Sequence, residues 1–371
     1  MNTIIPIPQP LRALLWLLAL ASWFPLAVRS ASTLSRDRLL EFENSRHEVR
    51  QAVSWSGWNA RKRDIRDAMQ SIMGALPNPA KRCALETQIE EKVACEGYER
   101  WRISYQVVPG HRVPAYLLIP DRALKGSTKC AGVLTLHQTH AEGQKVVVGL
   151  GKSPDDEYGV ELARRGYVCL APPYPMLANY WPSPRDLGFE SGTMLGVWIN
   201  IRGLDLLSSL PFVKRQGFGC IGHSLGGHNG MFTAAFDERI SAVVSSCGLD
   251  SFRDYYDGDP SVWQPERGWC QTRYMPRLAA YRGRLADIPF DFAEVIACVA
   301  PRSVFISAPL GDANFRWRSV DRVGESARPV FALKRATGQL VIRHPDSPHR
   351  FPPAAREEAY RFLDAALQRR R

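Results

Sequence analysis

The sequence predicts an α/β fold in which a mostly parallel central sheet is covered by helices on both faces. Three observations support this fold class. From residue 131 onwards, segments with the pattern of strands alternate with segments with the pattern of helices. Residues 131–136 form a continuous apolar run, typical of a strand buried on both faces. The chain has 371 residues, of which 45% are hydrophobic, and this is enough for one large core.

The elements are expected in the following order. Residues 34–75 mix charges with spaced apolar side chains, which predicts an N-terminal helical extension over 31–84 packed on the main body. Turn residues then separate short antiparallel strands, and the alternating region begins. The expected strands cover 86–94, 101–108, 113–119, 131–136, 167–171, 217–221, 240–246, 303–307 and 340–343. The expected helices cover 156–165, 193–210, 225–236 and 353–368. Residues 85–371 would form the main domain.

Residues 249–292 interrupt this rhythm and are rich in aromatic side chains, namely Tyr255, Tyr256, Trp263, Trp269, Tyr274 and Tyr281. We interpret them as an insertion over the carboxyl edge of the sheet, where folds of this class bind ligands. The rings would either pack a lid or face a flat, sugar-like substrate.

The first thirty residues have the pattern of a secretory signal peptide. Arg12 is followed by an apolar run over 13–21, and small residues follow at Ser30 and Ala31. Cleavage near residues 28–30 would remove two arginines and lower the net charge from +11 to +9. The mature chain would then be secreted or periplasmic, although a retained anchor is the alternative.

The charge distribution does not indicate a nucleic-acid partner. Lysine and arginine are scattered, and the short basic cluster over 61–63 is followed at once by Asp64. No nucleic-acid-binding motif is present. After signal cleavage we expect no stable membrane partner, and the sequence does not predict an oligomeric state.

The eight cysteines do not form a metal-binding pattern. The chain has no C-x-x-C pair and no zinc-like Cys/His spacing, so we expect neither metal nor cofactor. Export would permit disulfides, and Cys83 and Cys95, which flank one expected strand, are the candidate pair. Four others lie in or beside apolar runs and resemble small buried hydrophobic residues: Cys169, Cys220, Cys247 and Cys298.

The chemistry centres on the sequence Gly-His-Ser-Leu-Gly at 222–226. It matches G-x-S-x-G, follows an apolar strand and precedes a helical pattern, which is the setting this motif requires. A sharp strand-to-helix turn would expose the hydroxyl of Ser224 at a helix N-terminus, where free N–H groups favour negative charge. Ser224 is therefore the expected nucleophile.

A serine nucleophile needs a histidine base later in the chain. Three histidines follow Ser224. We interpret His228 as a packed residue of the helix, because it lies only four positions on. His349 precedes the closing helix in a loop that could reach the serine, so it is the expected base, and His344 is the alternative.

The acid should lie in a loop after a strand. Asp312 follows the strand at 303–307 and is the expected acid. Asp250, which follows the strand at 240–246, is the rival.

Two backbone N–H groups should form an oxyanion hole. We expect one from Leu225, next to the nucleophile, and one from Gln138, in the loop after the strand at 131–136. In the same loop His137 would be structural, while His140 and Lys145 could face the substrate.

These pieces resemble the dienelactone hydrolase and acetyl xylan esterase-like branch of the α/β-hydrolases over residues 85–371. The matching segments are 136–139, 165–168, 222–227, 245–248, 312–315 and 349–352. The resemblance implies an α/β-hydrolase fold, metal-free hydrolysis of a carboxylic ester, and a triad of Ser224, Asp312 and His349. The chain departs from dienelactone hydrolases proper, which use cysteine as the nucleophile, so dienelactone is not the expected substrate.

The expected activity is therefore that of a serine esterase acting through an acyl-enzyme on a small-molecule or carbohydrate ester, including acyl and acetyl esters of carbohydrates. Two alternatives stay open. One is a serine peptidase of the prolyl-oligopeptidase type, although residues 31–84 are too short for a propeller. The other is a non-catalytic carbohydrate-binding protein on the same fold.

Overall fold

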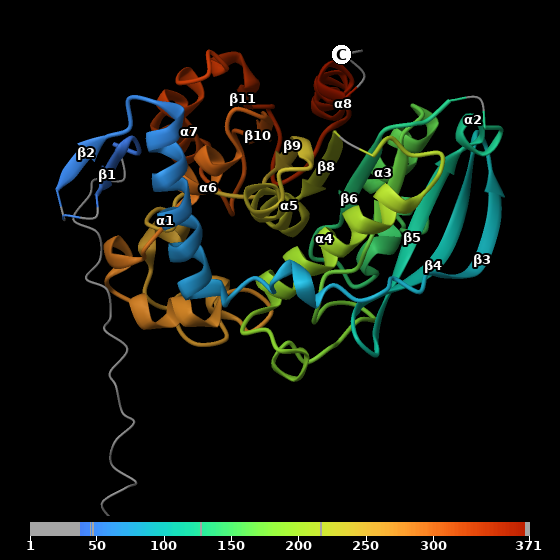
Figure 1. Ribbon diagram of the computed structural model, residues 1–371, viewed down its shortest axis with the longest axis horizontal. Coiled ribbons are helices and arrows are strands. Elements are labelled where there is room, and N and C mark those ends of the chain that lie inside the picture. Colours follow the sequence, from blue (N-terminus) through green and yellow to red (C-terminus); the bar gives the residue numbers. More distant parts are fainter. Residues whose placement is uncertain (1–37, 45, 47, 127, 216, 368–371) are drawn as a thin grey trace, which may run out of the picture. The chain divides into compact units, whose positions relative to one another are not determined.

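A nine-stranded sheet organises the structure, a computed structural model that describes residues 38–44, 46, 48–126, 128–215 and 217–367. The strand order is β11-β10-β9-β8-β6-β7-β5-β4-β3 (Figure 1). Neighbours from β11 to β7 are parallel, and β5, β4 and β3 join the sheet antiparallel. The strands are β3 (Gln88–Cys95), β4 (Tyr98–Val108), β5 (His111–Pro120), β6 (Gly132–Leu136), β7 (Val168–Ala171), β8 (Phe218–His223), β9 (Ile240–Ser246), β10 (Ser303–Ser307) and β11 (Leu340–Arg343).

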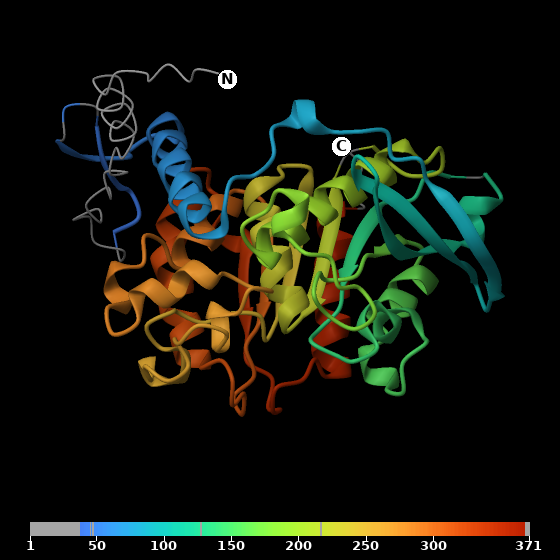
Figure 2. The same cartoon turned by 90° about the horizontal axis from the view of Figure 1, so that it is seen from below.

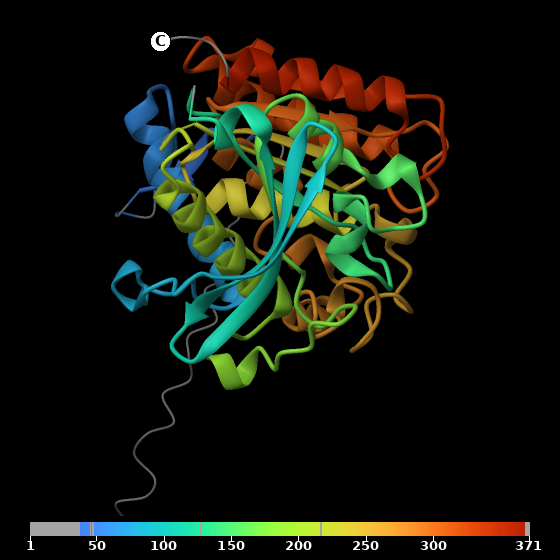
Figure 3. The ribbon, with the colours of Figure 1, turned by 90° about the vertical axis from the view of Figure 1, so that its right-hand side faces the viewer.

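Helices cover both faces of this sheet. They are α1 (Trp55–Met73), α2 (Asp121–Leu124), α3 (Tyr158–Arg164), α4 (Gly192–Ser209), α5 (Leu225–Phe236), α6 (Phe292–Val299), α7 (Trp317–Ala332) and α8 (Pro353–Leu367). Side chains of α1, α4, α5, α6 and α7 share one apolar core, and those of α3 and α8 share the other. In β6, Leu134 belongs to the first core and Val133 to the second, as the two-residue period of a strand requires. Figure 3 shows α3 and α4 on opposite sides of the strands. The predicted α/β class is confirmed.

The elements follow the predicted order closely. Strands β9, β10 and β11 and helix α5 have the predicted bounds, and the other predicted strands and helices are present with small shifts. Helices α2, α6 and α7 were not predicted. The side chains of Asp291 and Glu294 form a capping box at the start of α6. Helix α7 contains Pro329, which disguised its helical pattern.

The N-terminal part contains one long helix and a hairpin that the sequence pattern did not predict. Strands β1 (Glu41–Glu43) and β2 (Val49–Gln51) pair antiparallel. Helix α1 begins after Ser54, whose hydroxyl oxygen accepts a hydrogen bond from the Gly57 N–H at 3.2 Å. Trp58 and Met69 on α1 are buried. The chain then crosses from α1 to β3 at the far edge of the sheet (Figures 1 and 2).

The predicted signal peptide, residues 1–30, lies outside the described residues. Among the residues that are described, no helix is both long enough and apolar enough to span a bilayer.

The expected Cys83–Cys95 disulfide is wrong. All eight cysteines lie in the described ranges, and all are free thiols. Cys83 precedes β3 and Cys95 ends it, so an extended strand separates the two residues. At about 3.4 Å per residue, a strand of this length holds them far beyond the ~6 Å between Cα atoms that a disulfide needs.

Candidate active site

Ser224 lies at the sharp turn between β8 and α5. Its backbone has φ 51° and ψ −120°, outside the regions that residues with a side chain favour. The Ser224 N–H donates to the Ser246 carbonyl at 2.7 Å, and its own carbonyl accepts the first helical hydrogen bond, from His228, at 3.0 Å. These bonds hold the strained residue in place and leave its hydroxyl free of the helix.

The glycines on either side of Ser224 are required by space. A Cβ on Gly226 would lie 2.9 Å from the His137 carbonyl oxygen and still closer to that of Leu136. A Cβ on Gly222 would collide with the backbone of Gly226. The motif therefore brings the turn against the end of β6, which carries the loop at residues 137–140 to the serine.

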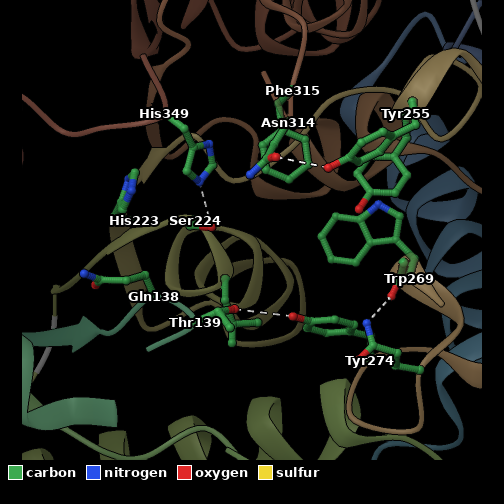
Figure 4. A pocket seen from close by; sticks show the side chains of 14 residues that line it. Gln138, Thr139, His223, Ser224, Tyr255, Trp269, Tyr274, Asn314, Phe315 and His349 are labelled. Atoms are coloured by element: carbon green, nitrogen blue, oxygen red, sulfur yellow. Dashed lines mark hydrogen bonds between the residues drawn. The ribbon is translucent and has the colours of Figure 1, made fainter. Parts of the chain in front are cut away.

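His349 reaches Ser224 from the loop between β11 and α8. Its Nε2 lies 3.0 Å from Ser224 Oγ (Figure 4). Its Nδ1 lies 2.9 and 3.0 Å from the two carboxylate oxygens of Asp312. A carboxylate only accepts hydrogen bonds, so Nδ1 carries the proton and Nε2 is free to accept one from the serine hydroxyl. The three side chains form a continuous hydrogen-bonded chain.

Asp312 lies in the loop after β10, where it is held as a charged group. Burial raises its pKa, but the hydrogen bond and charge of His349, with the N–H groups of Phe315 and Asn314, outweigh burial and lower the pKa overall. The two N–H groups donate to Oδ1 at 3.1 and 2.8 Å. The carboxylate can therefore orient the imidazole and stabilise its protonated form.

The rival residues are engaged elsewhere. His344 contacts the Ala308 carbonyl through Nδ1 at 2.8 Å and Asp321 through Nε2 at 2.9 Å. Asp250 is buried and accepts a hydrogen bond from the Arg316 N–H at 3.2 Å. Burial is the main cause that raises the pKa of Asp250 to about 8, so it is mostly protonated at neutral pH.

His228 is a packed residue, as its position on the helix predicted. It is fully buried, and its ring stacks on Trp269 with centroids 4.3 Å apart. Burial lowers its pKa to about 3, so the ring is neutral.

The residues expected at the oxyanion hole, Leu225 and Gln138, both line the pocket at Ser224. The side chain of Gln138 points away from Ser224 in Figure 4 and is hydrogen-bonded to Asp156. His137 fixes this loop, because its Nε2 accepts from the Tyr174 N–H at 2.9 Å and its Nδ1 then donates to the Gln138 carbonyl at 2.7 Å. Burial lowers the pKa of His137 to about 4 and keeps it neutral in this role.

The pocket at Ser224 has a volume of about 310 Å³ and an aromatic, largely uncharged lining. The insertion at 249–292 supplies Tyr255, Tyr256, Gly268, Trp269, Gln271 and Tyr274. Asn314 and Phe315, from the loop of Asp312, complete one wall (Figure 4). No lysine, arginine, aspartate or glutamate is among the described residues that line it, and His140 and Lys145 do not line it either.

Two neighbours of the site were not identified from the sequence. His223 packs against His349 with ring centroids 5.0 Å apart, and burial first, then the charge of His349, lowers its pKa to about 3. Cys247, which the sequence suggested was a plain core residue, lies beside Asp312 and His349. The adjacency of His223 to Ser224 was the available signal. Nothing in the sequence places Cys247 near Asp312 and His349, which lie 65 and 102 positions later in the chain.

No family model matches the chain. Among curated proteins, "Putative hydrolase YtaP" of Bacillus subtilis is 24% identical over 270 residues, which cover 70% of this chain and 85% of the relative.

Solved structures of similar fold include several carbohydrate esterases. A glucuronoyl esterase from Solibacter usitatus is 14% identical with a TM-score of 0.69, covering 91% of this chain and 98% of the other. A carbohydrate esterase family 15 glucuronoyl esterase from Caldicellulosiruptor kristjansonii is 18% identical with a TM-score of 0.65, and the match covers 87% of this chain and 88% of the other. A "putative acetyl xylan esterase" from Bacteroides fragilis is 16% identical with a TM-score of 0.54, and the match covers 78% of this chain and 76% of the other. The chain therefore has the α/β-hydrolase fold that the resemblance implied.

Proposed function

We propose that the chain is a serine esterase that hydrolyses a carboxylic ester through an acyl-enzyme intermediate. The observation that carries the proposal is the chain of hydrogen bonds from Ser224 Oγ through His349 to Asp312, which opens on a pocket of about 310 Å³. The hydrolase relative and the esterases of similar fold support the same class of reaction.

In the proposed mechanism Ser224 Oγ attacks the ester carbonyl carbon while His349 Nε2 takes the hydroxyl proton. Asp312 holds the imidazole by Nδ1 and stabilises its positive charge. The carbonyl oxygen becomes an oxyanion, which accepts hydrogen bonds from the N–H groups of Leu225 and Gln138. His349 then gives its proton to the alcohol oxygen as the C–O bond breaks and the alcohol leaves.

Water completes the cycle. His349 Nε2 takes a proton from the water molecule that attacks the acyl carbon, and a second oxyanion forms in the same hole. When this intermediate collapses, the proton returns to Ser224 Oγ and the carboxylic acid leaves.

We propose an uncharged carbohydrate ester, including an acetyl ester, as the substrate class. The lining supports this choice, because aromatic rings pack against the apolar faces of sugar rings, while the amides of Gln271 and Asn314 can hydrogen-bond to hydroxyl groups. The esterases of similar fold bear names that refer to glucuronoyl and xylan esters.

The rest of the proposal concerns the chain as a whole. We propose that residues 1–30 direct export and that the chain acts outside the cytoplasm, on the basis of the apolar run that follows Arg12. Residues 31–84 would then be an N-terminal extension of a catalytic domain over 85–371.

The test is the variant Ser224→Ala, assayed on acetylated xylan and on short-chain p-nitrophenyl esters. The rate should fall by several orders of magnitude with an unchanged melting temperature, because only one hydroxyl is lost. A fluorophosphonate probe should label the parent chain and not the variant. An undiminished rate in Ser224→Ala would overturn the proposal. Failure of the parent chain to react with the probe would favour a non-catalytic binding protein. A preference of the parent chain for peptide anilides over esters would favour a peptidase.

A further inference from the structure

Cys247 occupies an unusual position at the end of β9. Its backbone has φ 49°, a left-handed conformation that costs a residue with a side chain about 1–3 kcal/mol. Glycine would avoid this cost, so the thiol is held here at the expense of local strain. The Cys247 N–H donates to the Ser307 carbonyl at 2.8 Å, which ties the residue to the end of β10.

The thiol lies inside the proposed catalytic group. Cys247 Sγ, a carboxylate oxygen of Asp312 and a ring nitrogen of His349 all lie within 4.8 Å of one another. The thiol also lies 3.5 Å from the carbonyl oxygen of Arg350, the residue after His349. Three separate elements, the end of β9 and the loops after β10 and β11, therefore bring a sulfur, an oxygen and a nitrogen ligand to one point.

We propose that Cys247, Asp312 and His349 form an inhibitory binding site for a thiophilic divalent cation of the Zn²⁺ type. This donor set suits such an ion, because thiolate and imidazole are preferred ligands and a carboxylate is an accepted third one. The thiolate and carboxylate together balance the double positive charge, which a buried site requires. The ligand atoms would have to close to about 3.5 Å from one another, the spacing that bonds of 2.0–2.3 Å impose on a tetrahedral ion.

Of the three ligand residues, His349 lines the pocket at Ser224, whereas Cys247 and Asp312 lie behind it. The side chain of His349 is 23% exposed, whereas that of Asp312 is 1% exposed, so the ion would arrive at the imidazole first. A solvent molecule from the pocket can fill the fourth position. The loop between β11 and α8, which carries His349, is the element that would move.

The expected consequence is loss of the base. The ion binds His349 Nδ1, which gives up its proton; the ring then keeps its one proton on Nε2, and Cys247 becomes a thiolate. The ion, thiol and neutral imidazole thus become a bound complex plus one released proton. With Nε2 protonated, His349 cannot accept the proton of Ser224. This consequence rests on the proposed esterase function, whereas the binding itself does not.

The experiment has a binding arm that is independent of catalysis. Co²⁺ is added to the full chain, and the near-ultraviolet thiolate-to-cobalt absorption band is followed. We expect one equivalent to bind, with competition by Zn²⁺ and reversal by EDTA. The band should disappear in Cys247→Ser and in Cys247→Gly. Glycine adopts the left-handed backbone conformation of this position without strain, so the second variant is expected to fold. Cys83→Ser, which removes a half-buried thiol outside the site, should keep the band.

The inhibition arm uses the hydrolysis of a p-nitrophenyl ester, with each variant compared with its own metal-free rate. Zn²⁺ should inhibit the parent and Cys83→Ser equally, and its inhibition constant should rise at least about tenfold in both Cys247 variants. Mg²⁺ should not inhibit any of them. A Co²⁺ band that is absent from the parent, or that persists in both Cys247 variants, would refute the metal site even if esterase activity is present. Absence of esterase activity with the band intact would refute only the proposed function.

Discussion

Asp312 and Asp250 are two buried carboxyl groups with opposite properties. Asp312 is hydrogen-bonded to His349 and to two backbone N–H groups, which lower its pKa, and Asp250 accepts one backbone hydrogen bond and has its pKa raised. At pH 7, Asp312 is therefore charged, whereas Asp250 is mostly neutral. This difference allows a matched pair of variants to test the role of Asp312.

We expect Asp312→Asn to lower kcat by about three to four orders of magnitude, because an asparagine can donate to His349 Nδ1 and so favour the wrong tautomer. Asp250→Asn should change kcat by less than about threefold, since the hydrogen bond of Asp250 is with the Arg316 N–H and those of His349 are with Asp312 and Ser224. Steady-state hydrolysis of a p-nitrophenyl ester measures both. Equal losses in the two variants would reject the assignment of Asp312 as the acid.

Asp250 should also make the stability of the protein depend on pH. Its pKa is raised by burial to about 8, whereas an unfolded aspartate titrates near ~3.9. Between these values the folded chain keeps a proton that the unfolded chain releases, so the free energy of unfolding contributed by this residue falls as the pH rises from about 4 to about 8.

Asp250→Asn removes this dependence, because the amide oxygen can still accept from the Arg316 N–H and carries no charge. The melting temperature of the variant should exceed that of the parent by an amount that grows from pH 4 to pH 8 and then levels off. Thermal unfolding across this range measures it, with Asp67→Asn on the exposed side of α1 as the control. A constant difference at all pH values would contradict the raised pKa.

At the scale of elements, helix α5 joins the candidate site at its N-terminus to a group of arginines at its C-terminus. Ser224 lies at its N-terminus, and two half-buried arginines donate hydrogen bonds to carbonyl groups at its C-terminus. Arg302 Nη2 donates to the Ala234 carbonyl at 2.7 Å, and Arg66 Nε on α1 donates to the Ala235 carbonyl at 2.9 Å. Positive charge at this end of the helix is favourable, because the helix dipole is negative here.

Arg302 also donates to the carbonyl oxygens of Asp237, Ile240 and Val299, so one guanidinium joins the end of α5 to the starts of β9 and β10. Arg302→Met should therefore lower the free energy of unfolding by at least about 3 kcal/mol, since several buried carbonyls would lose their donor. Chemical denaturation measures the loss. Arg63→Met on the exposed face of α1 should change the free energy of unfolding by less than about 0.5 kcal/mol. A similar value for both variants would show that the hydrogen bonds of Arg302 to these carbonyl groups do not stabilise the fold.

The elements differ in how far the sequence could predict them. Strands such as β10 and helix α5 were predictable, because fully buried segments between turn residues have one dominant pattern. Helix α7 contains a proline, and hairpin β1–β2 is polar and short, so neither has a clear periodicity. The order Ser224, Asp312, His349 was expected because the motif fixes chain order in this fold. The contact of Cys247 with the last two could not be foreseen, since it depends on how three loops meet.

At the scale of the whole molecule, stability rests on packing and buried hydrogen bonds without covalent cross-links. All eight cysteines are free, in a chain whose first thirty residues predict export. Six of them are buried, including Cys169, Cys220 and Cys298, while Cys83 and Cys95 are half-buried. Burial raises the pKa of the Cys220 and Cys169 thiols, which keeps them protonated and unreactive.

We therefore expect dithiothreitol to leave the melting temperature unchanged within about 1 °C, because no disulfide contributes to the fold. In the native protein, Ellman's reagent should react quickly with the two half-buried thiols and slowly with the other six; in guanidinium chloride all eight should react. Mass spectrometry after alkylation identifies the fast sites, and Cys83→Ser should remove one of them. A large fall in melting temperature under reduction, or fewer than eight thiols in the unfolded chain, would show that a disulfide forms after all.

Fast labelling of Cys247 would show instead that the loop carrying His349 opens readily, because Asp312 and the Arg350 carbonyl otherwise cover that thiol.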